Sequence, residues 1–485
     1  MSVLDGNVWA VAKFGGSSVA SAARWTSIAG IVDSHVSAGR RVLVVCSALA
    51  SVTDRLTALD EARAAGDPVA HLLEEIERLH LELAAALDVD GPRVLSEMLS
   101  SLARAAAHER GVSSPRARAA LLAHGELLSS RLGAAYLAVR LADRGGATVV
   151  DARSLLAAEA APSPSAHFLS ARCPERSPID VRARLADVPT PVAVTQGFIA
   201  RGTDGETVLL GRGGSDASAA YMAAALEADV LEIWSDVPGL FTADPRVVPE
   251  ARLLRRLDYG EAHMLSSLGA RALHPRAIEP CRQRGITLHL GWTARPDVEG
   301  TRIGAAKGRR GARAITSRRE VALIAVERTM TWQPVGFLAA VSSAASQRQI
   351  AIDLIASAPA EIRLAIDVAG SPTARAELDA LIDDLRGLGK VTRWSHVGSV
   401  SAVGARSAPT AFLDADPRLV AHAADRSHVS VVVDQHQVPG LTQAAHHELF
   451  GREVDPAVFG PRWRDLQAPA EETGVEEAAP CRISA

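Results

Sequence analysis

Residues 207–246 decide the fold, and they read TVLLGRGGSDASAAYMAAALEADVLEIWSDVPGLFTADPR. Two short apolar runs, 208–210 and 230–235, bracket a glycine loop and a stretch, 217–225, made almost wholly of alanine and other helix formers. This pattern predicts a βαβ unit. Its loop presents unpaired backbone amides at a helix start, where an anion is stabilised by typically ~0.3–1 kcal/mol. The unit is therefore predicted to handle phosphate.

The loop from Gly211 to Asp216 allows two kinds of nucleotide site. A dinucleotide-binding fingerprint is supported by Asp236, which ends the next strand where a ribose-binding acid is expected. It is opposed by Asp216, because the fingerprint has glycine there and a carboxylate would face the pyrophosphate. An acid beside a phosphate cradle favours a Mg-nucleotide, and Arg212 adds a forked cation suited to carboxylate or phosphate. A tight turn without a ligand is the third interpretation.

Composition limits the class of protein. At 485 residues with 48% hydrophobic residues, the chain should hold about three domains, each with its own core. A net charge of −4 argues against a general nucleic-acid or membrane-surface role. No run approaches the ~20 apolar residues of a membrane span, and the first residues lack the pattern of a signal peptide, so we expect a cytoplasmic protein. Neither a zinc site nor a disulfide framework is predicted, because four cysteines lie far apart without a C-x-x-C pair: Cys46, Cys173, Cys281 and Cys481.

A second glycine loop, KFGGSS, begins with Lys13 and follows a predicted buried strand, 8–12. Only three of the 52 Lys and Arg residues are lysine. Where arginine fills nearly every basic position, a lysine in a glycine loop is expected to serve as a compact point charge. A helix with apolar spacing over 20–32 follows, and either Ser17 or Ser18 is predicted to cap it.

Polar residues also follow the predicted strand 42–46, a continuous apolar run typical of a parallel sheet covered on both faces. Ser47 and Thr53 come after its carboxyl end, the edge at which ligands bind in open α/β sheets. Residues 54–110 are rich in Ala, Leu, Glu and Arg, and they are predicted to be helical without chemistry of their own.

A helix predicted over 114–141 contains Gly125 between two ionisable residues. A mid-helix glycine costs about 1 kcal/mol relative to alanine, so its presence suggests a close approach by another group. Glu126 is the candidate ligand at this place. His124 is interpreted as a structural partner, because no second metal ligand lies at helical spacing. Residues 158–178, with four prolines among serines, are predicted to form a loop or lid.

The last third of the chain has a different pattern of predicted strands and helices. Short β-branched strands alternate with helices, which predicts two small α+β modules of ferredoxin-like type. The strands are expected at 321–326, 362–368 and 429–433 and the helices at 336–348, 373–388 and 441–449. The predicted parts are 1–298 (α/β domain), 299–319 (Gly/Arg-rich linker), 320–395 and 396–452 (the two modules, with strand exchange between them as an option) and 453–485 (tail).

Six ordered segments together resemble the aspartate kinases of the amino-acid kinase superfamily, over about residues 8–450. They are KFGGSSV at 13, VVCSALASVTDRL at 44, HGELLSS at 124, TQGFIARGTDGETVLLGRGGSD ending at 216, WSDVPGLFTADPR ending at 246 and LGARALHP at 268. RWTSIAG after the first segment resembles the branch in which the kinase is fused to diaminopimelate decarboxylase. The resemblance implies the amino-acid kinase fold, a mostly parallel sheet covered by helices on both faces, followed by two ACT modules in which GFLAAV at 336 and IDLIAS at 352 match the usual segments.

The resemblance implies phosphoryl transfer from ATP to the side-chain carboxylate of L-aspartate, giving 4-phospho-L-aspartate, the first step toward lysine, threonine and methionine. Mg²⁺ would arrive with ATP, without a cluster of protein ligands. The implied effector is an end-product amino acid, lysine or threonine. The ACT modules imply at least a dimer, and neither nucleic acid nor a membrane is an expected partner.

The resemblance also assigns site residues by position. Lys13, Asp216 and Arg212 are the implied catalytic residues, and Glu126 with Arg212 would hold the ammonium and a carboxylate of aspartate. The implied nucleotide residues are Lys13, Gly15, Gly16, Ser17, Gly213, Gly214, Ser235, Asp236, Phe241, Arg246 and Arg271; the implied aspartate residues are Ser47, Thr53, Glu126, Arg212 and Ser215; and the implied effector residues are Met330, Phe337, Asp353 and Ser357.

Four positions depart from the usual family pattern. Ser235 and Phe241 stand where Thr and Tyr are usual, Arg271 where Lys is usual, and Ser51 where Gly is often found. Two further functions therefore stay open. One is another acyl or carbamate kinase of the superfamily, which a residue pair suited to an α-amino acid disfavours. The other is a non-catalytic amino-acid sensor, which the first three departures suggest.

Overall fold

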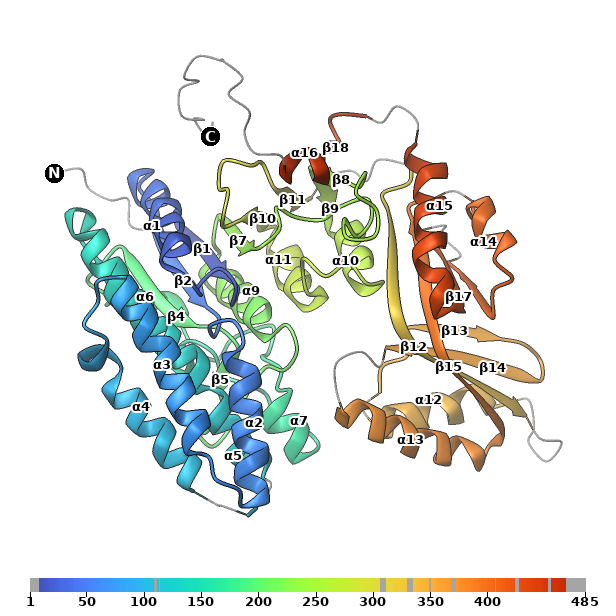
Figure 1. The fold of residues 1–485 in the computed structure, drawn as a ribbon, viewed down its shortest axis with the longest axis horizontal. Helices are drawn as coiled ribbons and strands as arrows, with labels where there is room; N and C mark the ends of the chain where they lie inside the picture. The colour runs from blue at the N-terminus through green and yellow to red at the C-terminus, as the bar shows by residue number, and fades with distance from the viewer. Residues whose placement is uncertain are drawn as a thin grey trace.

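The computed structural model describes residues 8–108, 111–112, 114–305, 311–328, 335–348, 350–367, 372–405, 407–423, 427–451 and 455–467. Figure 1 shows an α/β domain in the first part of the chain and a smaller α+β part built on a second sheet. The predicted fold class is therefore confirmed. The first sheet has the strand order β3 (Ala147–Val149), β4 (Val192–Gln196), β2 (Arg41–Cys46), β1 (Trp9–Phe14), β7 (Val230–Ser235), β10 (Thr287–Trp292), β11 (Thr301–Gly304) and β9 (Arg256–Asp258).

The centre of this sheet explains the continuous apolar runs in the sequence. Strand β1 is buried at all six positions and pairs in parallel with both β2 and β7. A strand covered on both faces needs apolar residues on both sides of the pleat, rather than an alternating pattern. Lys13 lies in register with Val45 and Ile233, one residue before the end of β1, at the shared carboxyl edge of three parallel strands.

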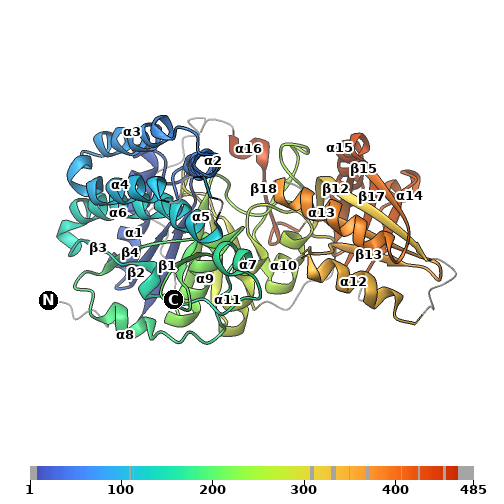
Figure 2. The same cartoon turned by 90° about the horizontal axis from the view of Figure 1, so that it is seen from below.

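Helices cover both faces of the sheet (Figure 2). Helices α1 and α6 contact one another and the strands on one face, while α9 and α11 contact one another on the other face. The hairpin β5 (Ile199–Arg201) and β6 (Thr207–Leu209) leads into α9. The helices of the domain are α1 (Ala22–Ser37), α2 (Val52–Ala65), α3 (Ala70–Ala86), α4 (Gly91–Ala107), α5 (Pro115–Leu122), α6 (His124–Arg140), α7 (Pro164–Leu169), α8 (Val181–Ala186), α9 (Gly214–Leu226), α10 (Tyr259–Ser267) and α11 (Ile278–Arg284).

Three helix predictions differ from the structure in their bounds. The cap of α1 is Ser21, whose side chain accepts a hydrogen bond from the Arg24 backbone, and not Ser17 or Ser18. Residues 54–110, predicted to be helical without internal bounds, form three helices, α2 to α4, because Gly66 ends the first in a left-handed conformation and Asp90 caps the third. The predicted helix 114–141 is interrupted at Ala123, between α5 and α6.

The second sheet serves two modules through two long shared strands. Its order is β13 (Leu354–Ser357), β14 (Glu361–Asp367), β12 (Ala314–Arg328), β15 (Gly389–Val403), β17 (His428–Asp434) and β16 (Leu419–His422). The later half of β12 pairs with β14, whereas its first half pairs with the part of β15 that also pairs with β17. Strands β12 and β15 therefore each run through both modules and join them in one sheet. The helices are α12 (Phe337–Gln347), α13 (Pro372–Arg386), α14 (Thr410–Asp414) and α15 (Val438–Phe450).

Two stretches outside the predicted domains are ordered parts of the α/β domain or the modules. Within residues 299–319, predicted as a linker, β11 joins the first sheet and β12 begins at Ala314. Within 453–485, predicted as a tail, β18 (Phe459–Arg462) pairs with β8 (Arg252–Leu254) and is followed by α16 (Trp463–Gln467). No helix of the described residues is both long and apolar enough to cross a membrane.

Candidate active site

The two glycine loops meet through an ion pair. Lys13 Nζ lies 2.5 Å from Asp216 Oδ1, and both side chains are largely shielded from solvent. Asp216 lies in the first turn of α9, where the positive end of the helix dipole stabilises a carboxylate. The structure thus brings together the lysine and the acid that the sequence placed about two hundred residues apart.

The glycines of both loops are required by close packing. A Cβ atom at Gly16 would lie 2.8 Å from the Ala48 carbonyl oxygen, and one at Gly213 would lie 2.1 Å from the His274 ring. Gly213 also has a φ of +68°, a conformation that favours glycine. The backbone of Gly15 donates to the Trp234 carbonyl at 3.1 Å, which fixes the first loop to the end of β7. The loops are therefore rigid, whatever ligand they bind.

Glu126 is a buried acid beside Lys13. Its residue is only 4% exposed, and burial raises its pKa to about 8, although backbone amides at Ala48 and at its own position and the Lys13 charge act in the opposite direction. Its Oε2 atom is buried and accepts no hydrogen bond from any described residue. A buried carboxylate with an open oxygen is the arrangement expected for binding a cation.

The helix that carries Glu126 is held on several sides. Gly125 allows close approach by the Ala48 side chain, since a Cβ atom would lie 2.7 Å from that methyl group. This contact is the close approach that the sequence suggested, although Gly125 lies in the first turn of α6 and not in mid-helix. Ser129 donates to the Ser47 carbonyl at 2.6 Å, which connects α6 to the loop after β2.

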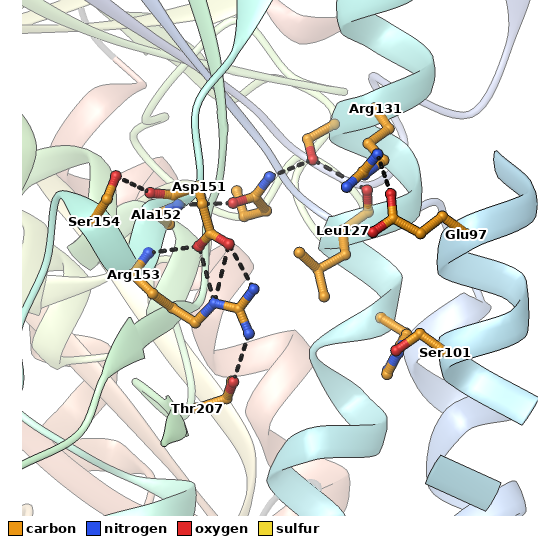
Figure 3. Close-up of polar contacts among 12 residues, drawn as sticks. Glu97, Ser101, Leu127, Arg131, Asp151, Ala152, Arg153, Ser154 and Thr207 are labelled. Atoms are coloured by element: carbon orange, nitrogen blue, oxygen red, sulfur yellow. Dashed lines mark hydrogen bonds and ion pairs between the residues drawn. The ribbon is translucent and has the colours of Figure 1, made fainter. Parts of the chain in front are cut away.

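A network of polar contacts connects α6 with β6, the strand before the loop that carries Arg212. Gln196, at the end of β4, donates to Ser130 at 2.7 Å and accepts from the Ala152 backbone at 2.8 Å. Arg153 then bridges Asp151 and the Thr207 hydroxyl at the start of β6 (Figure 3). The strand that leads into the loop of Arg212 is thereby tied to the helix of Glu126. His124 has a structural role in this helix, because its ring bonds the Ala120 carbonyl at 2.8 Å.

Arg212 and Thr53 line a cleft of about 1780 Å³ between the α/β domain and the first module. Its walls include residues of α5 and α7 on one side and of α12 and β14 on the other. Lys13 and Glu126 do not line this cleft. Arg212 lies in the loop before α9, four positions before Asp216 in the sequence. It therefore connects the buried ion pair with the wall of the open cleft. Ser215 packs against Gly197, whose added Cβ atom would lie 2.7 Å from the serine Cβ.

The implied nucleotide residues form a group at the end of β7. The Ser235 hydroxyl donates to the Val237 carbonyl at 3.0 Å, and Asp236 is exposed. Arg246 binds Asp244 with two hydrogen bonds, of 3.0 and 2.7 Å. Burial raises the pKa of Asp244, but these bonds and the charges of Arg246 and Arg271 outweigh burial and lower it. The pKa of Arg246 is raised by its hydrogen bonds with Asp244 and also by the Asp236 charge. Five side chains therefore lie near one another: Ser235, Asp236, Asp244, Arg246 and Arg271.

Two implied nucleotide residues are placed differently from the others. Ser17 is exposed beyond the Lys13 loop, and its neighbour Ser18 is buried, 2.7 Å from the Thr293 hydroxyl. Phe241 is only 8% exposed, and its ring meets the Trp463 ring edge-on at 5.5 Å. A nucleotide base could therefore reach Phe241 only beside a ring that the sequence analysis had assigned to the tail.

Some residues at the site were given no role by sequence reasoning. The His274 backbone donates to Asp216 at 3.4 Å, and its Nδ1 accepts from the Arg276 backbone at 3.3 Å. The pKa of His274 is lowered by burial and by the charges of Arg276 and Arg212, against the Asp216 charge that raises it. A neutral ring is thus packed on the glycine loop. Arg276 donates to the Leu210 carbonyl and, at 3.1 Å, to the Ala171 carbonyl. The motif LGARALHP at 268–275 contains His274 without assigning it a physical role, and Arg276 lies just beyond the motif.

The implied effector residues that the structure describes have different surroundings. Met330 lies outside the described residues. Phe337 is buried in the core under α12, and Ser357 is exposed at the end of β13. Asp353 accepts from Arg318 and from the Asp367 backbone, both at 2.7 Å. Burial raises the pKa of Asp353 despite the Arg318 charge.

The same Arg318 joins the first module to the α/β domain. It also forms an ion pair with Asp367 at 3.1 Å and donates to the Ser267 carbonyl at the end of α10. No group of three or more His, Cys, Asp or Glu side chains in the described part of the chain has the arrangement of a metal site. Cys46, Cys173 and Cys281 are buried and reduced.

The chain belongs to the Amino acid kinase family, whose profile matches residues 9–291. Among curated proteins it is similar to the lysine-sensitive aspartokinase 3 of Escherichia coli, with 29% identity over 91% of this chain and 99% of that protein. It is also similar to the chloroplastic aspartokinase 1 of Arabidopsis thaliana, with 28% identity over 91% of this chain and 80% of that protein.

Two solved structures of Escherichia coli aspartokinase III are similar to the whole chain at 28% identity. The complex with aspartate and ADP, described as the R-state, has a TM-score of 0.80 and covers 91% of this chain and 99% of that one. The complex with lysine and aspartate, described as the T-state, has a TM-score of 0.71 and covers 92% and 100%. The arrangement of domains in this chain is thus more similar to the complex with aspartate and ADP.

Proposed function

We propose that this protein is an aspartate kinase, which transfers the γ-phosphoryl group of ATP to the side-chain carboxylate of L-aspartate and forms 4-phospho-L-aspartate and ADP. The observation that carries the proposal is Glu126, a buried carboxylate with one open oxygen next to Lys13. This pair suits a zwitterion that presents an ammonium to the acid and a reacting carboxylate to the lysine. The likeness to a kinase solved with aspartate and ADP supports it.

The chemistry needs positioning and charge neutralisation more than covalent help. An oxygen of the ionised aspartate side chain attacks the γ-phosphorus, the bond to the β–γ bridging oxygen breaks, and ADP leaves with that electron pair. No proton has to be removed from the nucleophile. Lys13, oriented by Asp216, neutralises charge on the transferred group, and Arg212 holds the α-carboxylate from the cleft wall, with Ser47, Thr53 and Ser215 nearby.

The nucleotide is assigned to the group at the end of β7 and to the amides of the two glycine loops. The residues are Gly15, Gly16, Ser17, Gly213, Gly214, Ser235, Asp236, Phe241, Arg246 and Arg271. A divalent ion, Mg²⁺, would enter with ATP, and the carboxylate oxygens of Asp216 and Asp236 fit its preference for oxygen ligands. When bound, it would neutralise phosphate charge.

The two modules are proposed to bind an end-product amino acid, lysine or threonine, and to inhibit the kinase. In the first module, Asp353 is the carboxylate available to an effector ammonium once Arg318 moves away from it. Through the modules we propose at least a dimer, to be measured by light scattering. The reaction is proposed to occur in the cytoplasm, as the first step toward lysine, threonine and methionine.

The direct test is formation of aspartyl hydroxamate from aspartate, ATP and hydroxylamine. Turnover that depends on ATP and is lost in Lys13→Ala is expected. Glutamate, acetylglutamate and carbamate in the same assay separate an aspartate kinase from other kinases of the family. Binding of lysine or threonine without any turnover would instead identify an amino-acid sensor.

A further inference from the structure

A segment beyond the two modules returns to the α/β domain. Residues 459–467, here named the C-terminal strap, consist of β18 and the short helix α16, which lie beside β8 (Figure 1). Strand β18 pairs with β8 in antiparallel fashion, with Phe459 opposite Leu254 and Arg462 opposite Arg252. The strap therefore supplies one strand of a two-stranded sheet, and the other strand begins a few residues after the implied nucleotide segment, 234–246.

Trp463 is the residue of the strap that reaches this segment. Its backbone donates to the Ala251 carbonyl at 2.9 Å, and its ring meets Phe241 at 5.5 Å and Trp292 at 5.8 Å. Trp292 ends β10 in register with Ser235, the last residue of β7. The three rings thus form a continuous aromatic wall at the strand ends where the nucleotide is assigned.

The second module and strand β12 also contact the implied nucleotide segment, at Thr242. Thr242, next to Phe241, accepts from the Arg252 backbone at 2.9 Å, and its Oγ1 atom lies 2.9 Å from His446 Nε2. Burial lowers the pKa of His446 to about 4, so at neutral pH the ring is uncharged and shares one hydrogen bond with the threonine hydroxyl. The Ile315 backbone, in β12, donates to the Thr242 carbonyl at 2.8 Å.

The strap and the module are themselves connected. The Phe459 ring lies 5.7 Å from the Phe450 ring at the end of α15, and the Gln443 side chain donates to the Val247 carbonyl at 2.9 Å. The implied nucleotide segment is therefore held in part by chain segments that lie about two hundred residues further on. Phe241 also packs in a small apolar cluster with Ala243, Val248, Ala251 and Leu253, and Trp463 and Leu466 of the strap pack against this cluster.

We propose that Trp463 is a positioning residue for the nucleotide, acting through Phe241 and Trp292. The inference rests on the proposed function, because that function assigns ATP to this segment. Phe241 stands where a hydroxyl-bearing tyrosine is usual, so its ring cannot be anchored by a phenolic hydrogen bond. The edge-on contact with Trp463 supplies that anchor, and the strap is thereby a part of the nucleotide site.

The test compares Trp463→Ala with Trp463→Phe, which keeps an aromatic ring, and with Arg464→Ala as the matched control. Arg464 is an exposed strap residue paired only with acidic side chains at the surface, where such pairs contribute little. Because aromatic pairs contribute about 0.5–1.5 kcal/mol, loss of the ring should raise KM for ATP and Kd for ADP about 3- to 10-fold. KM for aspartate should stay within about twofold, and the Phe variant should recover most of the nucleotide affinity.

Calorimetric titration of ADP without aspartate keeps this test separate from the proposed function. Wild-type protein that binds ADP but forms no hydroxamate would refute the kinase assignment and leave the role of Trp463 measurable. If Trp463→Ala fails to fold, Trp463→Leu preserves apolar volume without a ring and is expected to show the same loss. An unchanged Kd for ADP in a folded variant without the ring, or an equal rise in both KM values, would overturn the inference.

Discussion

The aspartate side and the nucleotide side of the proposed site are built in different ways. Lys13, Glu126 and Asp216 lie on elements of one α/β domain, next to the carboxyl ends of its central strands. Phe241 and Thr242 lie on a loop that the second module and the C-terminal strap hold in place. The first side is built from the α/β domain, with Arg212 and Thr53 on the wall of the cleft that the first module also lines, whereas the second side is held by the second module and the strap. The modules are thus placed to alter nucleotide binding directly.

The largest effect is expected from Lys13→Ala. Loss of one well-placed charge on the transferred group should lower kcat about 100- to 1000-fold. Steady-state assays of hydroxamate formation measure it. Lys390→Ala is the control, because Lys390 is exposed and pairs only with Glu327, 3.2 Å away in the first module. A kcat within threefold of wild type would show that Lys13 does not take part in the reaction, and the aspartate side would then lack its proposed catalytic residue.

The pH dependence of aspartate use should be the next largest effect. Burial raises the pKa of Glu126 to about 8, and only its ionised form attracts an ammonium. In wild type, kcat/KM for aspartate should therefore fall about tenfold for each pH unit below 8. Profiles measured from pH 6 to 9 at saturating ATP show this directly. In Glu126→Gln the slope should disappear, and a slope that persisted there would belong to another group.

The pH dependence of thermal stability should show the raised pKa of Glu126 in the absence of substrate. A folded-state pKa raised above the unfolded value means that the folded protein binds the proton more tightly. Stability from Glu126 is therefore present at low pH and is lost as pH rises toward 8. Glu126→Gln lacks this loss, so its melting temperature should exceed that of wild type at pH 8 and approach it at pH 5. A constant difference across that range would contradict a raised pKa.

A small effect is expected where Ser51 stands in place of the family's glycine. Its φ of +67° is in the left-handed region, and its hydroxyl accepts from Arg55 at 2.7 Å. Ser51→Gly should relieve the strain and stabilise the protein by about 0.5–1 kcal/mol in urea unfolding. Ser51→Ala keeps the strain and loses the hydrogen bond, so it should not be more stable than wild type.

The aspartate side could be predicted from the sequence because its signals are local. Continuous apolar runs located β1, β2 and β7, and a rare lysine and an off-pattern acid in glycine loops indicated Lys13 and Asp216. Residues 54–110 were predicted only as helical, and the breaks at Gly66 and at the Asp-Gly-Pro of 90–92 were not assigned. These omissions concern bounds and leave the site unchanged.

The nucleotide side could not be predicted in the same way. Trp463 covers Phe241 across 222 positions of sequence, and no periodicity in the last residues indicates which loop an isolated tryptophan will meet. Strand β12 likewise serves both modules because it runs through a bulge at Arg318–Val321, which local propensity does not show. Long-range pairing of this kind is decided by packing between segments and not by their own composition.

The most direct test of the central claim compares, at pH 9 where Glu126 is ionised, the two Michaelis constants of Glu126→Gln with those of wild type. The account predicts that KM for aspartate rises about 10- to 100-fold, because a buried hydrogen bond to a charged group contributes about 1.5–3 kcal/mol, while KM for ATP changes less than about twofold. An unchanged KM for aspartate, or an equal rise in both constants, would show that Glu126 does not bind the substrate ammonium and that the acid and Lys13 do not form one reaction centre.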